Sequence, residues 1–413
     1  MNKLRYFTSG ESHGRALTGI LEGVPSGFPL SSDDIDRDLK RRQGGYGRGG
    51  RMKIESDHAG ILSGVRKGET TGAPVALLIE NKDWENWQDV MRVECRGPKT
   101  GIKDARHDPV TRPRPGHADL AGALKYGHKD IRNILERSSA RETAMRVALG
   151  AIAKKLLSEF DVRTGSFITR IGKVQSPETG VKSSEEQLLS MFDNAEKSPV
   201  RCPDTVAGGK MVRLIDKAKR DGNTLGGIFE VFVTGLPPGL GSHVQWDRKL
   251  DGRLAQALMS IQAIKGVEIG SGFEMAGRFG SEVMDEIFYS SPPSRSSTGR
   301  GRAGGRYGFY RKTNNAGGIE GGMTNSMPLV IRAVMKPIPT LRRPLMSVDI
   351  NTKKPFEAAY ERSDVCAVPA AAVVAEAMAA LVVADAFLDK FGGDSRKEIM
   401  HNFSSYISYL NKF

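Results

Sequence analysis

The sequence is poor in cysteine and lacks the spacings that hold a structural metal or a disulfide framework. Its three cysteines, Cys95, Cys202 and Cys366, include no C-x-x-C pair. A disulfide-stabilised secreted protein is therefore not expected, and a reducing, cytoplasmic setting is the default. The motifs G-x-x-x-x-G-K-[ST] and H-E-x-x-H are also absent. The usual signals of nucleotide hydrolysis and zinc-dependent hydrolysis are thus missing, and no metal ligands are predicted.

Long apolar segments are missing as well. The amino-terminal residues lack the apolar run of a signal peptide. The most apolar stretch, Ala370–Leu388, contains Glu376 and Asp385, so it is too polar to cross a bilayer and is expected to be a buried helix. Neither a linker nor a low-complexity block divides the chain. We therefore expect a single domain over residues 1–413, without membrane association.

The sequence is rich in positive charge and glycine. It contains 61 lysines and arginines against 48 aspartates and glutamates, a formal net charge of +13, and it contains 48 glycines. Such an excess suits nucleic acid, an anionic membrane surface or an acidic small substrate. Much of the charge lies beside glycines and not in a lysine-rich tail, so its placement matters more than its size.

A faint internal duplication runs through the chain. Five positions recur 212 residues later, where Gly10, Gly14, Gly23, Pro25 and Gly27 correspond to Gly222, Gly226, Gly235, Pro237 and Gly239. In each copy a strand-like run, Leu17–Leu21 or Ile228–Val233, reaches a G-x-P-x-G turn. A helix with a polar start follows each turn, near Ser32–Arg41 and Asp247–Ala263.

A second echo, 225 residues apart, relates Arg137-Ser138-Ser139 to Arg362-Ser363-Asp364. Chance matching of glycines explains either echo alone, but two echoes in the same order favour a duplication. We predict an α/β fold, a single large layered β-α-β sandwich with a pseudo-twofold repeat of two halves, roughly 1–210 and 211–413. Because Ser139 corresponds to Asp364, the halves differ in their polar residues, and one active site built from both is expected.

Two short segments place a histidine where a ligand could reach it. Gly10–Gly14 (GESHG) sets His13 among small residues, and Arg112–Asp119 (RPRPGHAD) holds Arg114 and His117 between prolines. An imidazole in such a loop can titrate near neutral pH, and proline lowers the entropic cost of a preorganised site. The alternative for His13 is a surface turn whose histidine binds a backbone carbonyl.

An arginine- and glycine-rich segment spans Arg41–Arg51 (RRQGGYGRGGR). It contains G-x-G-x-x-G, but a charged helical segment precedes it and a strand-like run follows, which is the reverse of a dinucleotide-binding unit. What remains is a flexible loop with four arginines, suited to bidentate contacts with phosphate and carboxylates. The Gly44–Arg51 part is also similar to the RGG segments of RNA-binding proteins, so a basic RNA-binding protein is the alternative function.

The segment Arg137–Thr143 combines a helix start with charge. Ser139 and Glu142 have the spacing of a capping box. A helix start flanked by two arginines is also an anion site, and both interpretations are compatible.

Three further features lie near the carboxyl end. Paired glycines in Gly317–Asn325 permit close approach of a flat ligand, and Lys336 precedes a proline-fixed turn. Asp364 is either a base or an ion-pair partner of Arg362, and without context the ion pair is favoured.

Five segments together resemble chorismate synthase, in order and along almost the whole chain. They are Gly10–Gly27, Gln43–Met52, Arg137–Thr143, Gly317–Asn325 and Arg362–Pro369 (RSDVCAVP). Ser326 departs from the family, which usually has glycine there. The resemblance implies the anti-1,4-elimination of phosphate and a C6 hydrogen from 5-enolpyruvylshikimate 3-phosphate, giving chorismate in the shikimate pathway to aromatic amino acids. It also implies a need for reduced FMN without net redox change, and a homotetramer.

The resemblance assigns roles to residues at matching positions. His13 is similar to the acid that protonates the departing phosphate, His117 to the residue that sets the protonation of reduced flavin, and Asp364 to the aspartate that relays the C6 proton. Ser12 and Ser139 would support these groups. The anions of the substrate, or the phosphate of NADP, would be bound by Arg42, Arg48, Arg51, Arg114 and Arg141. Flavin contacts would come from Arg137, Ser138, Ser139, Gln262, Ala263, Gly321, Lys336, Pro337, Ile338, Pro339, Thr340 and Arg362.

Two rival interpretations differ in what the protein binds. An RNA-binding protein predicts strongly salt-dependent nucleic-acid binding and no flavin complex. A flavin reductase would need a nicotinamide site, which we do not find in the sequence. We therefore expect NADPH to act only indirectly, through reduction of the flavin, and we expect no nucleic-acid partner.

Overall fold

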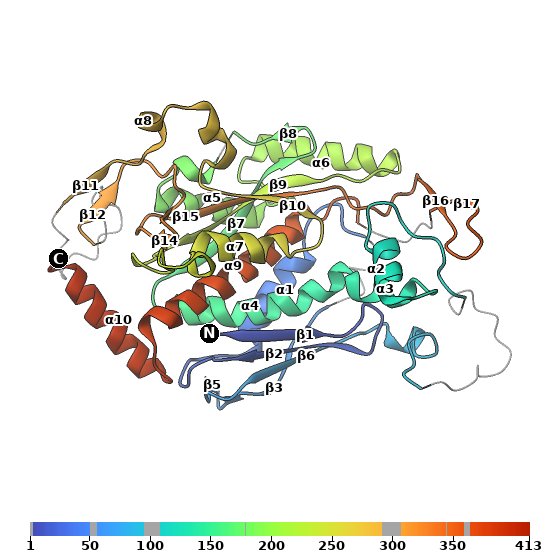
Figure 1. Ribbon diagram of the computed structural model, residues 1–413, viewed down its shortest axis with the longest axis horizontal. Coiled ribbons are helices and arrows are strands. Elements are labelled where there is room, and N and C mark those ends of the chain that lie inside the picture. Colours follow the sequence, from blue (N-terminus) through green and yellow to red (C-terminus); the bar gives the residue numbers. More distant parts are fainter. Residues whose placement is uncertain are drawn as a thin grey trace.

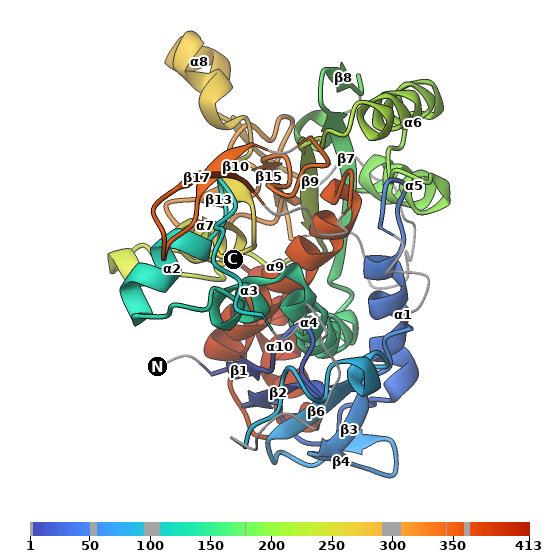
Figure 2. The ribbon, with the colours of Figure 1, turned by 90° about the vertical axis from the view of Figure 1, so that its right-hand side faces the viewer.

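The computed structural model describes residues 3–49, 56–94, 108–177, 179–290, 307–343, 345–358 and 364–413. A layer of helices lies between two antiparallel sheets, and Figures 1 and 2 show the three layers from two directions. The helices of the middle layer are α1 (Ser32–Gln43), α4 (Thr143–Ser158), α7 (Leu250–Met259) and α9 (Val368–Phe391). The α/β class predicted from the sequence is confirmed.

Helix α9 is the core of the molecule. It is apolar on every side, Pro369 occupies its first turn, where the missing N–H costs nothing, and the chain leaves it at Gly392. It crosses α4 so closely at Gly150 that an added Cβ there would overlap Ala377. The helix is long and apolar enough to span a membrane, but 94% of its most apolar window is buried inside the protein. It is therefore a buried helix, as predicted for Ala370–Leu388, but the reason given from the sequence is wrong, because Glu376 and Asp385 do not make the helix too polar for a span.

The first sheet lies on one side of the helical layer. Its strands are β1 (Arg5–Ser9), β2 (Ala16–Glu22), β6 (Val75–Glu80) and β3 (Gly60–Ser63), in the order β1-β2-β6-β3. Burial alternates along β2, with Leu17 and Leu21 facing the helices. Gly19 brings β2 against α4, because an added Cβ would lie 2.5 Å from Met145 Sδ.

The second sheet covers the opposite side of the helical layer. It has the order β10-β15-β9-β7-β8. Its strands are β7 (Arg163–Ile171), β8 (Val174–Gln175), β9 (Gly227–Thr234), β10 (Ile264–Ile269) and β15 (Leu329–Met335). The central strands β7 and β9 are buried along most of their length, since α9 packs on one face and α5 (Glu185–Lys197) on the other.

Smaller elements surround these layers. The helices are α2 (Asp119–Tyr126), α3 (Arg132–Ser138), α6 (Thr205–Arg220), α8 (Gly280–Val283) and α10 (Arg396–Leu410). The paired short strands are β4 (Val65–Arg66) with β5 (Glu69–Thr70), β11 (Ile287–Tyr289) with β12 (Phe309–Arg311), β13 (Ile319–Glu320) with β14 (Met323–Thr324), and β16 (Met346–Val348) with β17 (Pro355–Glu357).

The elements predicted from the G-x-P-x-G echo are confirmed. The two strand-like runs are β2 and β9, and the two helices are α1 and α7. Helix α7 is shorter than predicted, because Asp247 lies in a separate 3-10 helix, Trp246–Arg248, and α7 itself runs only from Leu250 to Met259. The predicted capping box at Ser139 is wrong in one respect. Ser139 Oγ accepts from Arg141 N in a short 3-10 helix, Ala140–Glu142, and α4 begins only at Thr143. The Glu142 side chain does not accept from the backbone N–H of Ser139, as a capping box requires, because its carboxylate binds Arg146 and Thr8.

The arginine-rich segment is held more firmly than its composition predicts. Arg41 and Arg42 belong to α1, and in the following residues Tyr46 N donates to Pro199 O at 2.7 Å. Gly47 O accepts from the backbone N–H groups of Val365, at 2.7 Å, and Cys366, at 3.3 Å. Residues 44–49 are thus fixed against the segment that leads into α9, while Arg51 lies outside the described residues.

Replacement of Gly47 by alanine is expected to destabilise the protein more than the same change at Gly68. Both glycines have left-handed backbones, with φ +90 and +80, which costs alanine about 1–2 kcal/mol. A Cβ at Gly47 would also lie 2.9 Å from Ile215 Cγ2, whereas nothing lies within 4 Å at Gly68. This crowding adds roughly 1–3 kcal/mol. Urea unfolding of both variants measures the difference, and equal losses would show that the packing around Gly47 contributes nothing.

Candidate active site

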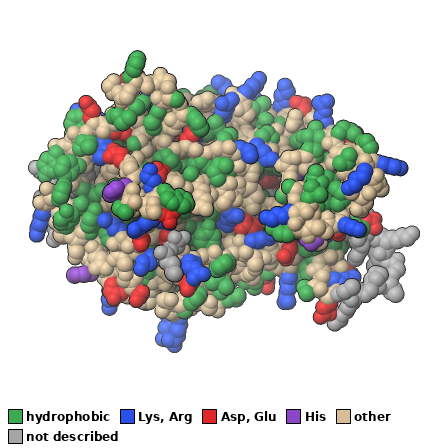
Figure 3. Space-filling view, viewed as in Figure 1, with side chains coloured by type: hydrophobic (Ala, Val, Ile, Leu, Met, Phe, Trp, Pro, Cys, Tyr) green, Lys and Arg blue, Asp and Glu red, His purple; other side chains and the backbone are tan. Residues whose placement is uncertain are grey.

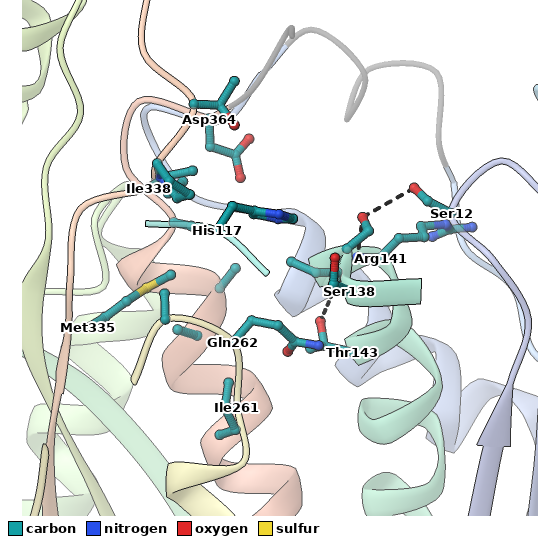
Figure 4. A pocket seen from close by; sticks show the side chains of 18 of the residues that line it. Ser12, His117, Ser138, Arg141, Thr143, Ile261, Gln262, Met335, Ile338 and Asp364 are labelled. Atoms are coloured by element: carbon teal, nitrogen blue, oxygen red, sulfur yellow. Dashed lines mark hydrogen bonds between the residues drawn. The ribbon is translucent and has the colours of Figure 1, made fainter. Parts of the chain in front are cut away.

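A cavity of about 610 Å³ opens where the helical layer meets the loops at its ends. That volume lies in the range of small-molecule sites, roughly 300–1,000 Å³. In Figure 4, Asp364, Ile338 and His117 lie on one side of it, Ser12, Arg141 and Ser138 on the other, and Ile261, Gln262 and Met335 toward the base. Its walls come from both halves of the sequence, because some of the residues within 12–13, 42–49, 114–118 and 135–143 line it together with some of those within 261–263, 335–340 and 364–374.

The lining is strongly cationic on one part and apolar on another. Five cationic side chains and a single carboxylate, Asp364, are among the lining residues; the cations are Arg42, Arg48, Arg114, Arg141 and Lys336. Apolar contacts come from α9 and the neighbouring loops, through Ile261, Met335, Ile338, Ala367, Ala370, Ala371 and Val374. Such a site favours a ligand with several negative charges and a flat apolar part. Among the described residues, no group of three His, Cys, Asp or Glu could hold a metal ion.

His13 is held by a buried carboxylate that the sequence analysis did not identify. Its Nδ1 lies 2.8 Å from Glu136 Oε1, and its backbone N–H donates to Glu136 Oε2 at 2.7 Å. The ring stacks on Trp87 with 3.8 Å between centroids. Because the carboxylate occupies Nδ1, Nε2 is the nitrogen through which His13 can exchange a proton with a ligand. The alternative of a surface turn with a histidine bonded to a carbonyl is therefore not what the structure has.

His117 has an analogous arrangement. Its Nδ1 lies 2.5 Å from Asp119 Oδ1, and Arg114 Nε donates to Asp119 Oδ2 at 2.8 Å. Arg114 also donates from Nη1 to Thr340 Oγ1 at 3.4 Å. Burial works against the charged carboxylate, but the hydrogen bonds from His117 and Arg114 outweigh it and hold the pKa of Asp119 below its usual range. Asp119 thus remains an anion that orients both neighbours.

Arg42 and Arg141 share a buried carboxylate, Asp57. Arg141 Nη1 donates to Asp57 Oδ1 at 2.5 Å, and Arg42 Nη1 lies 3.6 Å from Asp57 Oδ2. Arg42 also donates to Thr143 Oγ1 and to the carbonyl of Ala140. One carboxylate between two guanidinium groups leaves a net positive charge at this wall of the cavity, which favours an anionic ligand.

Asp364 pairs with Arg48. The two side chains approach to 3.2 Å, and Gly49 N donates to Asp364 Oδ1 at 2.6 Å. Arg48 is thus a partner of Asp364 among the described residues, and the predicted partner Arg362 lies outside them. Nearby, burial raises the pKa of the Cys366 thiol to about 12. This cysteine therefore stays protonated and is unsuited to nucleophilic chemistry.

Ser12 and Ser139 join the two halves of the polar wall. Ser139 Oγ donates to Ser12 Oγ at 3.2 Å, while Ser12 N donates to the carbonyl of Glu136. The segment Gly10–Gly14 formally matches G-x-S-x-G, the string of a serine nucleophile elbow. It connects the antiparallel strands β1 and β2, whereas such an elbow requires a strand followed by a helix.

Gln262, Ala263 and Lys336 form the side of the cavity below the second sheet. Lys336 N donates to Ala263 O at 2.9 Å, and its Nζ donates to Gly116 O at 2.5 Å. Ala263 has φ +67, a left-handed conformation that alanine rarely adopts and that often marks a functional site. Gln262 Oε1 is buried and has no hydrogen-bond partner among the described residues. A buried amide oxygen of this kind fits a ligand that donates a hydrogen bond.

Not every predicted site residue lines the cavity. Arg137 lies outside it, where its guanidinium donates to the carbonyls of Thr8 and Gly10. Gly321, in the turn between β13 and β14, and Pro337 are also absent from the lining. Arg51 and Arg362 lie outside the described residues. The other predicted residues line the cavity: Ser12, His13, Arg42, Arg48, Arg114, His117, Ser138, Ser139, Arg141, Gln262, Ala263, Lys336, Ile338, Pro339, Thr340 and Asp364.

The family model, the curated relatives and the solved structure described below are all chorismate synthases. The family model described as chorismate synthase matches residues 4–388. The chain is 54% identical over 413 residues to the chorismate synthase of Aquifex aeolicus strain VF5, covering 99% of both chains. It is 57% identical over 410 residues to that of Geobacter metallireducens, covering 99% of this chain and 100% of the relative. A crystal structure of chorismate synthase superimposes with a TM-score of 0.78 at 45% identity, covering 99% of both.

Proposed function

The chain belongs to the chorismate synthase family, and we propose that the cationic cavity at the ends of the helical layer is its active site. The enzyme is a lyase of the shikimate pathway. It eliminates phosphate and a C6 hydrogen from 5-enolpyruvylshikimate 3-phosphate to give chorismate, and it uses reduced FMN. The observation that carries the assignment of the site is a cavity lining that combines five cations, one carboxylate and an apolar wall.

The cations match the charges of the substrate. A phosphate and two carboxylates need several donors, and Arg42, Arg48, Arg114 and Arg141 reach the cavity from three separate segments. Arg51 is proposed for the same role from its position in the family alone. The buried partners Asp57 and Asp119 hold three of these guanidinium groups in place before a ligand arrives. Such preorganisation lowers the cost of binding the charge that develops on the departing phosphate.

The apolar wall and its neighbours fit reduced FMN. Ser138, Ser139, Gln262, Ala263, Lys336 and the turn Ile338–Thr340 would hold it, since they combine apolar surface, a lysine and the buried amide of Gln262. The corresponding assignments of Arg137, Gly321, Pro337 and Arg362 rest on family position only. Reduced FMN, when bound, would supply an electron-rich ring, and the overall reaction leaves its redox state unchanged. NADPH enters only indirectly, through reduction of the flavin.

The histidines and Asp364 would handle the protons. His13 presents Nε2, and we assign to it the proton given to the departing phosphate. Asp364, beside Arg48, receives the proton lost from C6. His117, held by Asp119, controls the protonation state of the reduced cofactor. Ser12 and Ser139 fix the loop that carries His13.

An anaerobic assay tests this assignment. Photoreduced FMN and 5-enolpyruvylshikimate 3-phosphate are expected to give one phosphate for each chorismate formed. The alternative function predicts no turnover and RNA binding that weakens steeply with salt. Turnover without salt-dependent RNA binding supports the enzyme, and the reverse result supports the alternative.

Replacement of Arg48 by alanine is expected to raise the substrate KM by roughly 10–100-fold, the loss typical of one charged hydrogen bond. The affinity for FMN should change little, because Arg48 is assigned to the anions of the substrate and its guanidinium pairs with Asp364. Lys40→Ala is the matched control, since this exposed lysine of α1 does not line the cavity. Separate titrations of the two ligands decide the point. A loss of flavin affinity alone would show that Arg48 binds FMN and not the substrate.

A duplicated single domain is also part of the proposal, with halves of roughly 1–210 and 211–413. The corresponding glycines of both G-x-P-x-G turns have positive φ, +90 and +81 at Gly23 and Gly27, +78 and +82 at Gly235 and Gly239. The strands before these turns and the helices after them also correspond, and α4 packs directly on α9. Superposition of the two halves on each other, strand by strand, tests the duplication.

We further propose a homotetramer in the cytoplasm. Hydrophobic side chains gather at the end of the molecule formed by β11, β12 and the end of α10 (Figure 3). Tyr289, Phe309, Tyr409 and Phe413 form this patch and are 59%, 42%, 55% and 78% exposed. A monomer rarely exposes four adjoining aromatic rings. Light scattering of the purified protein measures the oligomeric state.

A further inference from the structure

The loop that carries His13 makes three of its hydrogen bonds with one residue of α3, Glu136. Gly10 has φ +102 and the loop is rich in small residues, so it has little conformational preference of its own. Ser12 N donates to the carbonyl of Glu136 at 3.0 Å, and the backbone and ring of His13 donate to the two carboxylate oxygens. Three hydrogen bonds thus connect the loop to a single residue on a helix.

Glu136 is placed so that it can restrain the orientation of the His13 ring. The residue is 2% exposed, whereas the His13 side chain is 18% exposed and lines the cavity. Trp87 stacks on the ring at 26° between planes, so the ring is restrained by its face and by one edge. A carboxylate only accepts hydrogen bonds. Nδ1 must therefore carry its hydrogen, and Nε2 exchanges the proton of the reaction.

We propose that Glu136 is a positioning residue for the elimination, acting through His13. It holds the ring through Nδ1, so that the proton given to the departing phosphate comes from Nε2 and the neutral ring that results keeps its hydrogen at Nδ1, in the way that a buried aspartate orients the histidine of a serine protease. This proposal rests on the role of His13 proposed above. The pair differs from His117 and Asp119, because Asp119 also binds Arg114, whereas both carboxylate oxygens of Glu136 accept from His13.

The variant Glu136→Gln tests the proposal with almost no change of shape. An amide has one acceptor and one donor end, so it cannot accept from both the backbone and Nδ1 of His13. The ring is expected to reverse its tautomer or turn away. In the anaerobic assay with reduced FMN, kcat should fall by about 10²–10⁴-fold, while substrate KM and FMN affinity stay within about threefold. Histidine-selective 15N NMR should show the loss of the protonated Nδ1 signal of His13.

Two further variants separate positioning from a structural role. Glu159→Gln, which removes a carboxylate paired with Arg396, is the control and should leave kcat unchanged. In a His13→Ala background, Glu136→Gln should lower kcat no further, since Glu136 acts through the absent ring. If Glu136→Gln does not fold, Glu136→Asp, which keeps the charge and shortens the reach, should show a smaller loss of the same kind.

The outcomes are distinct. A Glu136→Gln enzyme with wild-type kcat and an unchanged His13 signal overturns the proposal, as does an additive loss in the double variant. Turnover by the wild-type enzyme in the same assay tests the proposed function separately, so failure of one is not confused with failure of the other.

Discussion

Replacement of His13 by alanine is expected to lower kcat by about 10²–10⁴-fold, the usual contribution of a general acid. The ring lies at the cavity wall between Trp87 and Glu136 and takes no part in the hydrophobic core. The fold should therefore persist. Some destabilisation is expected, about 1–3 kcal/mol, because Glu136 keeps its burial and loses one hydrogen-bond donor. Steady-state kinetics at saturating substrate and reduced FMN, together with a thermal melt, measure both effects.

A second histidine provides the control for this prediction. His58 is bonded to Asp36, and its side chain is 66% exposed. His58→Ala removes an imidazole of the same kind away from the cavity and should leave turnover unchanged. If His13→Ala retains near-wild-type kcat, the phosphate leaves without help from this residue, and its assignment as the acid is wrong.

The fold was predictable where local pattern and burial agree. The apolar run of Ala370–Leu388 lies within α9, and the two G-x-P-x-G turns follow β2 and β9. In each case the chain itself supplies the signal, through side-chain spacing or through glycine at a position with positive φ. Ser326 is informative in the same way. It has φ +74, which explains why glycine is usual at this position in the family.

The site was predictable only in part, because its partners come from distant segments. His13 and His117 could be selected from loops that hold small or rigid residues. Glu136, which binds His13, is 123 positions away along the chain, and no spacing rule relates the two. Asp57 likewise binds two arginines that are distant in the sequence, Arg42 in the last turn of α1 and Arg141 in the 3-10 helix before α4. Long-range pairs of this kind are created by the packing of the layers, which one sequence does not reveal.

The capping box at Ser139 failed for a related reason. Glu142 has the correct spacing to return to Ser139, but its carboxylate lies among Thr8, Arg146 and Gln262. Burial disfavours the charged form, yet the attraction of Arg146 and the hydrogen bonds from Thr8, Arg146 and Gln262 together outweigh it and lower the pKa of Glu142. A competing tertiary contact therefore overrode a local preference.

Arg41 and Arg42 show how two adjacent residues take opposite roles. On a helix, successive side chains point about 100° apart, so Arg42 faces the cavity while Arg41 faces the interior between α1 and α9. Arg41 donates to both oxygens of Glu376 at 2.8 Å. Lys154, Arg201 and Ser166 bind the same carboxylate, which is fully buried. Composition predicted four arginines for ligand binding, and one of them stabilises the core.

Replacement of Glu376 by glutamine is expected to destabilise the protein by about 3–5 kcal/mol at neutral pH, the cost of removing one partner from a buried ion cluster. Burial opposes ionisation of Glu376, but the surrounding cations outweigh it, so its pKa lies below the usual value. A depressed pKa contributes stability that is present above the unfolded-state pKa and is lost as the pH falls toward the folded-state value. Urea unfolding should therefore show a constant gap between wild type and variant near neutrality, and a narrowing gap below about pH 4. The exposed pair Glu22 and Arg5 provides the control, since Glu22→Gln should cost less than about 1 kcal/mol. A Glu376→Gln protein as stable as wild type would show that the glutamine amide satisfies the cluster and that its charge is not required.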